Sequence, residues 1–262
     1  MPHVLAYHRP TSLEDALALL ARPAATTRVL AGGTIVNADP RAAPVEVVDL
    51  QALGLESIYA ADGGATIGAT ATLQDIADHD GLPEVLRILA RRELPSAMRT
   101  LATIGGTIAM REWESPLIAG LLAFEAVVTV AALASGEADV PREAEVPLAE
   151  ILDRGVPTGG LIVGVQIRTD GRAAIAHTAR TPADTPIVAV VARRMPDGTA
   201  RIGASGVATT AILVEPQSIH RLGPPGDFRG TPGYRRHLAA VLVGRALAEL
   251  GGAGTDATKA AS

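Results

Sequence analysis

The first fifty residues contain three short apolar segments and one segment whose apolar residues recur at helical spacing. Three short apolar runs are predicted to be strands, at residues 3–7, 28–31 and 45–50. Between the first two, apolar residues recur at helical spacing over residues 13–20, with Ser12 in front as a candidate N-cap, which predicts an amphipathic helix. Residues 37–44 are predicted to be a loop. The chain therefore begins with a small βαβ-like unit.

The middle of the chain mixes hairpin and helix patterns. Residues 58–60 and 65–68 flank the turn-forming residues 62–64, which predicts a β-hairpin. Thr72 is placed to cap a helix that follows it. Two helices are therefore predicted after the hairpin, at residues 73–80 and 82–92.

The most apolar segment, residues 117–134, is long enough to raise the question of membrane insertion. Glu125 lies near its middle, where a charge is costly in lipid, and the second half is β-branched. We therefore predict a buried helix, a turn at Glu125 and a buried strand. A short helix at residues 147–153 and a strand at residues 161–167 are expected to follow.

From residue 173 onward the pattern becomes β-rich. Apolar or alternating runs predict antiparallel strands at residues 173–178, 187–194 and 200–208. After a Pro-Pro-Gly break, residues 234–250 are predicted to be an amphipathic helix rich in Ala, Leu and Arg. The small, polar residues 251–262 are expected to be a frayed end.

Two loops share one pattern, an apolar lead-in followed by Gly-Gly-Thr. The first glycine loop is residues 31–34 and the second is residues 103–107. Paired glycines permit positive φ and close approach of a ligand, and successive backbone amides can then surround a phosphate. Two such loops could hold the two halves of a pyrophosphate. A plain turn is the alternative for each, since the chain has 27 glycines and neither loop is a Walker A or G-x-G-x-x-G motif.

Charge and composition exclude several classes of function. The net charge of -5 and the aromatic content of 2% argue against a nucleic-acid partner. Because the chain has no cysteine, disulfides, cysteine nucleophiles and iron–sulfur ligation by its own cysteines are excluded. The first ten residues contain no apolar signal-peptide core, so we expect a cytoplasmic protein without a membrane span.

The order of the motifs resembles the FAD-binding medium subunit of the molybdenum hydroxylases, the family of carbon monoxide dehydrogenase and xanthine dehydrogenase. The resemblance spans nearly the whole chain. The segments that carry it are, in order, YHRPTSLEDALALL, VLAGGT, VVDL, IGATATLQDIA, TIGGTIA, LLAFEAVV, LIVGVQI, ARTPADTPIVAVVA, ARIGASGVA and DFRGTPGYRRHLAAVLVGRAL.

This resemblance implies an α+β fold, a vanillyl-alcohol-oxidase-type two-lobed FAD-binding module with a C-terminal three-stranded antiparallel sheet and helices. The implied division is a small α/β lobe at residues 1–54, a larger α+β lobe at residues 55–168, and a C-terminal domain at residues 169–262. In such proteins the two glycine loops hold the FAD pyrophosphate between the first two lobes.

The resemblance also implies which residues bind FAD. On the first lobe they are Arg28, Val29, Leu30, Ala31, Gly32, Gly33, Thr34, Ile35 and Val36. On the second lobe they are Thr103, Gly105, Gly106, Thr107, Ala109, Ser115 and Ile162. No catalytic residue and no metal ligand is implied.

The sequence departs from the family pattern at three places. Thr107 stands where the family usually has Asn, and Pro116 stands where it has Asp, whose carboxylate meets the adenosine end of FAD; Glu114 is a candidate substitute. The family also has a basic residue near the flavin in the third lobe, for which His177 and Arg180 are candidates here.

Several polar residues also have plain surface interpretations. Arg28 is equally a phosphate ligand or the solvated end of a strand. Glu112, Trp113 and Glu114 could face the cofactor, but a surface loop is the favoured interpretation. The remaining candidates are assigned to the surface or to partner contacts (Arg235 and Arg236), to a solvated helix face (Asp75, Asp78 and Asp80), or to histidines without metal-ligand spacing (His79, His177 and His220).

The leading functional hypothesis is an FAD-dependent oxidoreductase subunit that transfers electrons. The resemblance implies a molybdenum-binding large subunit and an iron–sulfur small subunit as partners, and NAD or a quinone-type acceptor. One alternative is a diverged scaffold with a weakened or lost FAD site that acts as a binding or interaction protein. Another is a stand-alone flavin oxidoreductase with its own small substrate.

Overall fold

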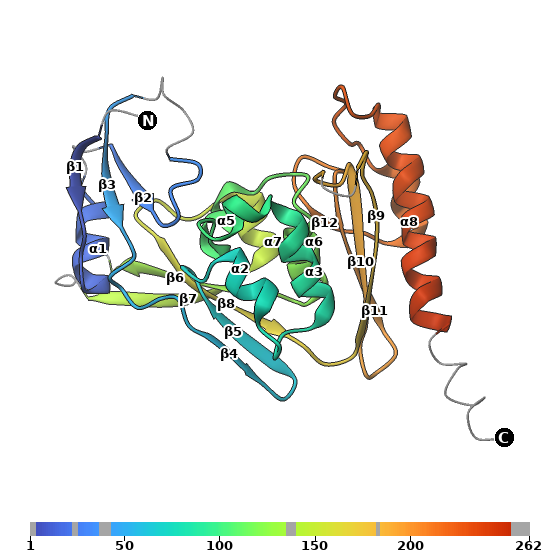
Figure 1. Ribbon diagram of the computed structural model, residues 1–262, viewed down its shortest axis with the longest axis horizontal. Coiled ribbons are helices and arrows are strands. Elements are labelled where there is room, and N and C mark those ends of the chain that lie inside the picture. The colour runs from blue at the N-terminus through green and yellow to red at the C-terminus, as the bar shows by residue number, and fades with distance from the viewer. Residues whose placement is uncertain (1–3, 23–25, 37–42, 135–139, 182–183, 253–262) are drawn as a thin grey trace.

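The computed structural model describes residues 4–22, 26–36, 43–134, 140–181 and 184–252. Three β-sheets follow one another along the chain and along the long axis of the molecule (Figure 1). The predicted mixed α+β fold is confirmed. Most of the predicted loop at residues 37–44 and nearly all of the predicted frayed end lie outside the described residues.

The first sheet is a parallel one with the strand order β1-β3-β2. Helix α1 (Leu13–Leu20) begins at Ser12, whose hydroxyl accepts a hydrogen bond from the amide of Asp15 at 3.1 Å, so the predicted cap is confirmed. The buried side chains of α1 pack against residues of the neighbouring sheet. The strands are β1 (Val4–His8), β2 (Thr27–Leu30) and β3 (Val45–Asp49).

The second sheet has five antiparallel strands in the order β4-β5-β8-β6-β7. They are β4 (Ile58–Ala61), β5 (Gly64–Gly68), β6 (Val127–Leu133), β7 (Pro141–Pro147) and β8 (Leu161–Arg168). The helices of this part of the chain are α2 (Leu73–Asp78), α3 (Glu84–Glu93), α4 (Ser96–Arg99), α5 (Ile104–Met110), α6 (Pro116–Ala123) and α7 (Leu148–Arg154). Thr72 and Asp75 form a reciprocal capping box at the start of α2.

The apolar segment folds as predicted, into a helix, a turn and a strand. All eight residues of α6 are buried, and Glu125 adopts a positive φ of 54° where the chain turns into β6. Among the described residues, no helix has both the length and the apolar character needed to cross a membrane.

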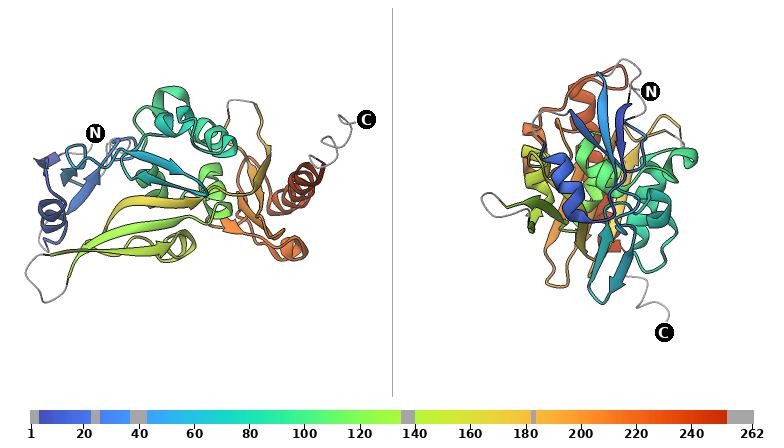
Figure 2. Two further views of the ribbon diagram at one scale, coloured as in Figure 1. Left: turned by 90° about the horizontal axis from the view of Figure 1, so that it is seen from below. Right: turned by 90° about the vertical axis from the view of Figure 1, so that its left-hand side faces the viewer.

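The third sheet is antiparallel, with the order β12-β11-β10-β9. The resemblance implied three strands, and the two-residue β12 adds a fourth at the edge. Helix α6 packs on one face of this sheet and α8 on the other, as Figure 1 and the left view of Figure 2 show. The elements are β9 (Arg172–Thr178), β10 (Val188–Arg194), β11 (Ala200–Ser205), β12 (Ile212–Leu213), the 3-10 helix η1 (Pro216–Arg221) and α8 (Pro232–Gly252).

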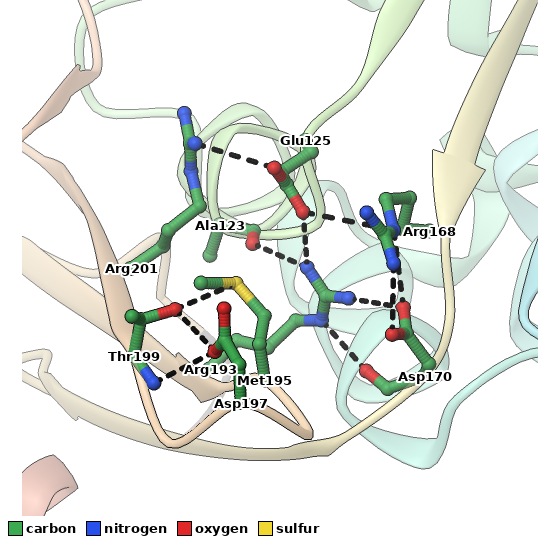
Figure 3. Close-up of polar contacts among 9 residues, drawn as sticks. All are labelled: Ala123, Glu125, Arg168, Asp170, Arg193, Met195, Asp197, Thr199 and Arg201. Carbon is green, nitrogen blue, oxygen red and sulfur yellow. Dashed lines mark hydrogen bonds and ion pairs between the residues drawn. The ribbon is translucent and has the colours of Figure 1, made fainter.

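A fully buried arginine, Arg193 of β10, connects the third sheet to the turn after α6 (Figure 3). Its guanidinium donates to Asp170 at 2.6 Å and to Glu125 at 3.0 Å, and it lies over the ring of Phe124. Arg201 of β11 donates to the same Glu125 at 3.3 Å. A buried guanidinium needs such partners, because an unpaired charge in the interior is costly.

A second buried arginine, Arg235 of α8, corrects the surface interpretation of this residue. It forms ion pairs with Glu114 and Asp227, both at 2.8 Å, and lies 4.4 Å from the ring centroid of Trp113. Arg229 also pairs with Glu114. The Trp113–Glu114 segment is therefore an internal contact with the C-terminal helix rather than a free surface loop.

Candidate functional site

One cavity of about 390 Å³ lies between the first sheet and the helices of the second, within the usual size range of ligand sites. Both glycine loops contribute to it. Of the residues that the resemblance implied, those that line it are Arg28, Val29, Ala31, Gly32, Gly33, Thr34, Ile35, Val36, Thr103, Gly105, Gly106, Thr107, Ala109 and Ile162. Their contact with FAD stays a prediction, but the fold brings them to one place.

Two implied residues and three candidate substitutes lie outside this lining. Leu30 pairs with β3, and its carbonyl accepts from the amide of Leu50 at 3.0 Å. Ser115 is buried and caps α6 by accepting from the amide of Ile118 at 3.1 Å. The others are engaged elsewhere: Glu114 with arginines, Arg180 over the ring of Phe228, and His177 on β9. The third lobe thus supplies no basic residue to the described cavity wall.

The first glycine loop leaves its amides available. Gly33 has a φ of 71°, and a Cβ on Gly32 would lie 1.7 Å from the carbonyl oxygen of Leu101, so neither position suits a side chain. Within residues 26–36 and the rest of the described chain, the amides of Gly32, Gly33 and Thr34 have no acceptor. The exposed Arg28 likewise has no ion-pair partner there. Free amides and a cation are what an anion site needs.

The second glycine loop behaves differently, and the prediction of an amide cradle there is wrong. Its residues form the first turn of α5, with Thr103 as the N-cap. The amide of Gly105 donates to the carbonyl of Ala69 at 2.9 Å, that of Gly106 to the Thr103 hydroxyl at 3.2 Å, and that of Thr107 to the Thr103 carbonyl at 2.9 Å. A tertiary backbone bond, a capping bond and a helix bond have therefore used the amides that were expected to meet a phosphate.

Two acidic residues lie in the cavity wall: Glu112, which the sequence had suggested could face the cofactor, and Glu93, which was missed. Glu112 is exposed, whereas Glu93 is only 8% exposed. Glu93 follows Leu86, Leu89 and Ala90 at helical spacing on the buried face of α3. That spacing is a signal that the sequence does contain, because it places a carboxyl on an otherwise apolar stripe.

The surroundings of Glu93 favour its neutral form. Burial raises its pKa to about 7, and the charge of Glu112 acts in the same direction. Hydrogen bonding from the Ser115 side chain and from the Leu117 amide, whose nitrogen lies 3.0 Å from Oε2, offsets only part of this effect. The carboxyl of Glu93 in the cavity wall thus titrates near neutral pH.

A second cavity of about 790 Å³ adjoins the first, since Leu94 lines both. Arg91, Arg92 and Arg99 line it, and Arg92 forms no hydrogen bond or ion pair with the described residues. In the same part of the chain no three His, Asp or Glu side chains gather as a metal site. The positive charge of the arginines that line this second cavity therefore suits an anionic ligand.

The fold and the first cavity define a class of protein: an α+β module with a ligand-sized cavity between its first two sheets and a further sheet attached. Comparison with known families agrees. The model for the FAD binding domain in molybdopterin dehydrogenase matches residues 3–167.

Relatives and solved structures extend this likeness over nearly the whole chain. The protein YgfM of Escherichia coli strain K12 is 30% identical over 267 residues, covering 96% of this chain and 98% of YgfM. The carbon monoxide dehydrogenase of Hydrogenophaga pseudoflava that lacks the Mo-pyranopterin moiety shares the fold with a TM-score of 0.81 at 22% identity, over 94% of this chain and 97% of that one. Quinoline 2-oxidoreductase from Pseudomonas putida 86 does so with a TM-score of 0.79 at 19% identity, over 94% and 96%.

The chain belongs to the family of FAD-binding domains of molybdopterin dehydrogenases. The resemblance inferred from the sequence is thereby confirmed, and FAD is the cofactor of the family.

Proposed function

We propose that this chain binds FAD in the cavity between its first two lobes and serves as the electron-transfer subunit of a molybdenum hydroxylase-type oxidoreductase. Electrons pass from iron–sulfur clusters of a partner chain to FAD and then to an external acceptor. The lobes of this proposal are residues 1–54, 55–168 and 169–262.

The first glycine loop carries the proposal. The amides of Gly32, Gly33 and Thr34, which have no acceptor within the described residues, and the exposed Arg28 fit the two negative charges of a pyrophosphate. Gly32 also lets the loop rest directly on the Leu101 carbonyl, which brings the two lobes together around the cavity. The mostly aliphatic remainder of the lining fits flat ring systems by excluding water.

When bound, FAD supplies the redox chemistry, because it can exchange electrons both singly and in pairs. This chain then needs only to bind, orient and insulate the cofactor. The absence of cysteine fits a partner chain that holds the iron–sulfur clusters, and the molybdenum centre belongs to a further large subunit. The arginine-lined cavity beside Leu94 favours an anionic acceptor such as NAD over a neutral quinone.

Titration with FAD tests the proposal directly. The purified chain is titrated while flavin fluorescence and binding heat are followed, and saturable one-to-one binding is expected. The Thr34→Ala and Arg28→Ala variants should bind more weakly with unchanged folding. Affinity purification of the native chain is expected to recover chains containing molybdenum and iron–sulfur clusters; recovery of this chain alone, with its own flavin-dependent turnover, would instead support a stand-alone oxidoreductase.

A diverged scaffold that no longer binds FAD is the second candidate, and the second glycine loop favours it. The amides of that loop are engaged, and the Thr107 hydroxyl donates to the Thr103 carbonyl at 3.1 Å. A native chain that takes up no FAD, together with a Thr107→Asn, Pro116→Asp double variant that does, would establish this alternative.

A further inference from the structure

Glu93 is a buried acid in the cofactor cavity that the electron-transfer role does not require. It lies at the last residue of α3, where that helix meets the start of α6, and it lines the cavity together with both glycine loops. A buried carboxyl is normally held by a cation, but none of the described cations forms an ion pair with Glu93.

The groups around Glu93 come from five elements. The start of α6 offers the Leu117 amide and the Ser115 hydroxyl, which accepts from Ile118 and so keeps its own hydrogen to donate. Glu112 acts on it from the segment between α5 and α6. On α2 and α4, Asp75 caps its helix, Asp78 accepts from Gln74, and Arg99 donates to the Arg91 and Leu94 carbonyls. On β9, Arg172 is exposed, and burial together with the charge of Arg92 lowers the pKa of His177.

We propose that Glu93 is a proton-linked contact of the bound cofactor: it is neutral in the complex and donates a hydrogen bond to an acceptor atom of FAD, so that binding takes up a proton. This inference rests on the proposed FAD site. Nothing is oxidised or reduced in the step, because the proton comes from solvent and goes to one Glu93 oxygen.

Electrostatics give the direction of the linkage. A Glu93 carboxylate would share the cavity with the doubly negative pyrophosphate and with Glu112, which disfavours the charged form. Cofactor binding also removes water from the cavity, and this raises the pKa of Glu93 further. The free chain is about half protonated near pH 7, so the complex must gain part of a proton there. Above that pH the affinity for FAD falls, with a limiting slope of about tenfold per pH unit.

Calorimetry of FAD binding tests the linkage on the full chain. FAD is titrated into wild type, Glu93→Gln and Glu112→Gln from pH 6 to 9, and at pH 7.5 in two buffers with different ionisation enthalpies. For wild type we expect a dissociation constant that rises roughly tenfold or more over this range, and proton uptake at pH 7.5. Glu93→Gln, which keeps an acceptor for the Leu117 amide, should bind without either dependence. Glu112→Gln removes one charge from the same wall and should retain both.

Infrared difference spectra of the wild type give a measurement that needs no variant. FAD binding at pH 8 should increase the band of protonated carboxyl groups. Wild-type FAD binding with no such increase, or with the same pH profile and proton count as Glu93→Gln, would overturn the role of Glu93 and leave the FAD site standing. Failure of the wild type to bind FAD between pH 6 and 9 would instead overturn the FAD site, and this inference with it.

Discussion

The two glycine loops have nearly the same sequence pattern and very different structures. In the first, the chain leaves β2, and the amides of Gly32, Gly33 and Thr34 have no acceptor among the described residues. In the second, the Gly105 amide donates to the Ala69 carbonyl and the Gly106 amide to the hydroxyl of Thr103, the N-cap of α5. The walls differ in charge as well, with Arg28 beside the first loop and two carboxyls on the opposite side. A Gly-Gly-Thr sequence therefore does not define an anion site; the hydrogen bonds of its neighbours decide whether it can be one.

The largest expected effect is at Gly32, where the first loop meets the second lobe. Gly32→Ala places a methyl 1.7 Å from the Leu101 oxygen, so the loop must move. We expect a loss of about 3 kcal/mol in the free energy of unfolding and about 100-fold weaker FAD binding, measured by urea denaturation and by calorimetry.

Gly203→Ala is the matched control for this variant. Its Cβ would lie 1.9 Å from the Ala119 oxygen, between β11 and α6 and away from the cavity. It should lower stability similarly but leave the FAD affinity of the folded protein unchanged. Equal loss of affinity in both variants would mean that Gly32 acts only through stability.

The acidic wall is expected to give a pH-dependent effect of similar size. The pKa of Glu93 is raised from 4.5 to about 7 in the folded chain, so stability that is present below pH 4.5 is lost as the pH rises to 7. Relative to Glu93→Gln, the wild type should lose about 3 kcal/mol across this window. Urea denaturation of the FAD-free proteins at pH 4.5 and pH 8 measures the difference, and a constant difference between the two would contradict a buried, titrating Glu93.

Substituting Thr103 or Thr34 by alanine should separate effects on FAD binding from effects on stability. Thr103→Ala removes the N-cap of α5 and is expected to cost about 1 kcal/mol of unfolding free energy. The Thr34 hydroxyl has no partner in the described chain, so Thr34→Ala should lose far less unfolding free energy. This variant should nevertheless weaken FAD binding more than Thr103→Ala does. If both variants lost the same stability and affinity, the contrast between the loops would be lost.

The smallest effect is expected for Gly106→Ala. A helical alanine gains up to about 1 kcal/mol over glycine, but the new Cβ would lie 3.1 Å from the Thr103 hydroxyl oxygen, so the net change in stability should be within about 0.5 kcal/mol. Gly33→Ala, at a φ of 71°, should cost about 1 kcal/mol instead. Thermal denaturation of the two variants side by side compares them.

Hydrophobic periodicity and capping residues were enough to predict most elements. Ser12 and Thr72 cap the helices expected of them, and Glu125 turns the chain where a charge interrupts an apolar run. The segment Pro141–Pro147 was missed because it is a polar edge strand, whose side chains show no apolar alternation and whose prolines suit an unpaired edge. Glycine's poor helix propensity likewise concealed α5, which the packing of Ile104 and Ile108 stabilises.

Apart from Glu93, whose place on an apolar stripe is visible in the sequence, the burial of charged side chains was what the sequence could not predict. Each of two adjacent arginine pairs has one buried and one exposed member: Arg193 with Arg194, and Arg235 with Arg236. Strand and helix geometry turns the two side chains of a pair in different directions, but only the tertiary partners, such as Asp170 and Glu114, make the buried position tolerable. The convergence of residues from different lobes on one cavity likewise depends on long-range contacts that local sequence does not reveal.

The stacking of Arg235 on Trp113 has a practical consequence. Trp113 is the single tryptophan of the chain, it directly follows Glu112 of the cavity lining, and it is held by the C-terminal helix. The fluorescence of this single tryptophan is thus an intrinsic probe of the protein. A flavin in the cavity would quench its intensity, and detachment of the last helix would shift its emission wavelength. Cofactor loading and the docking of the C-terminal domain can therefore be followed in the unlabelled protein, by intensity and by wavelength.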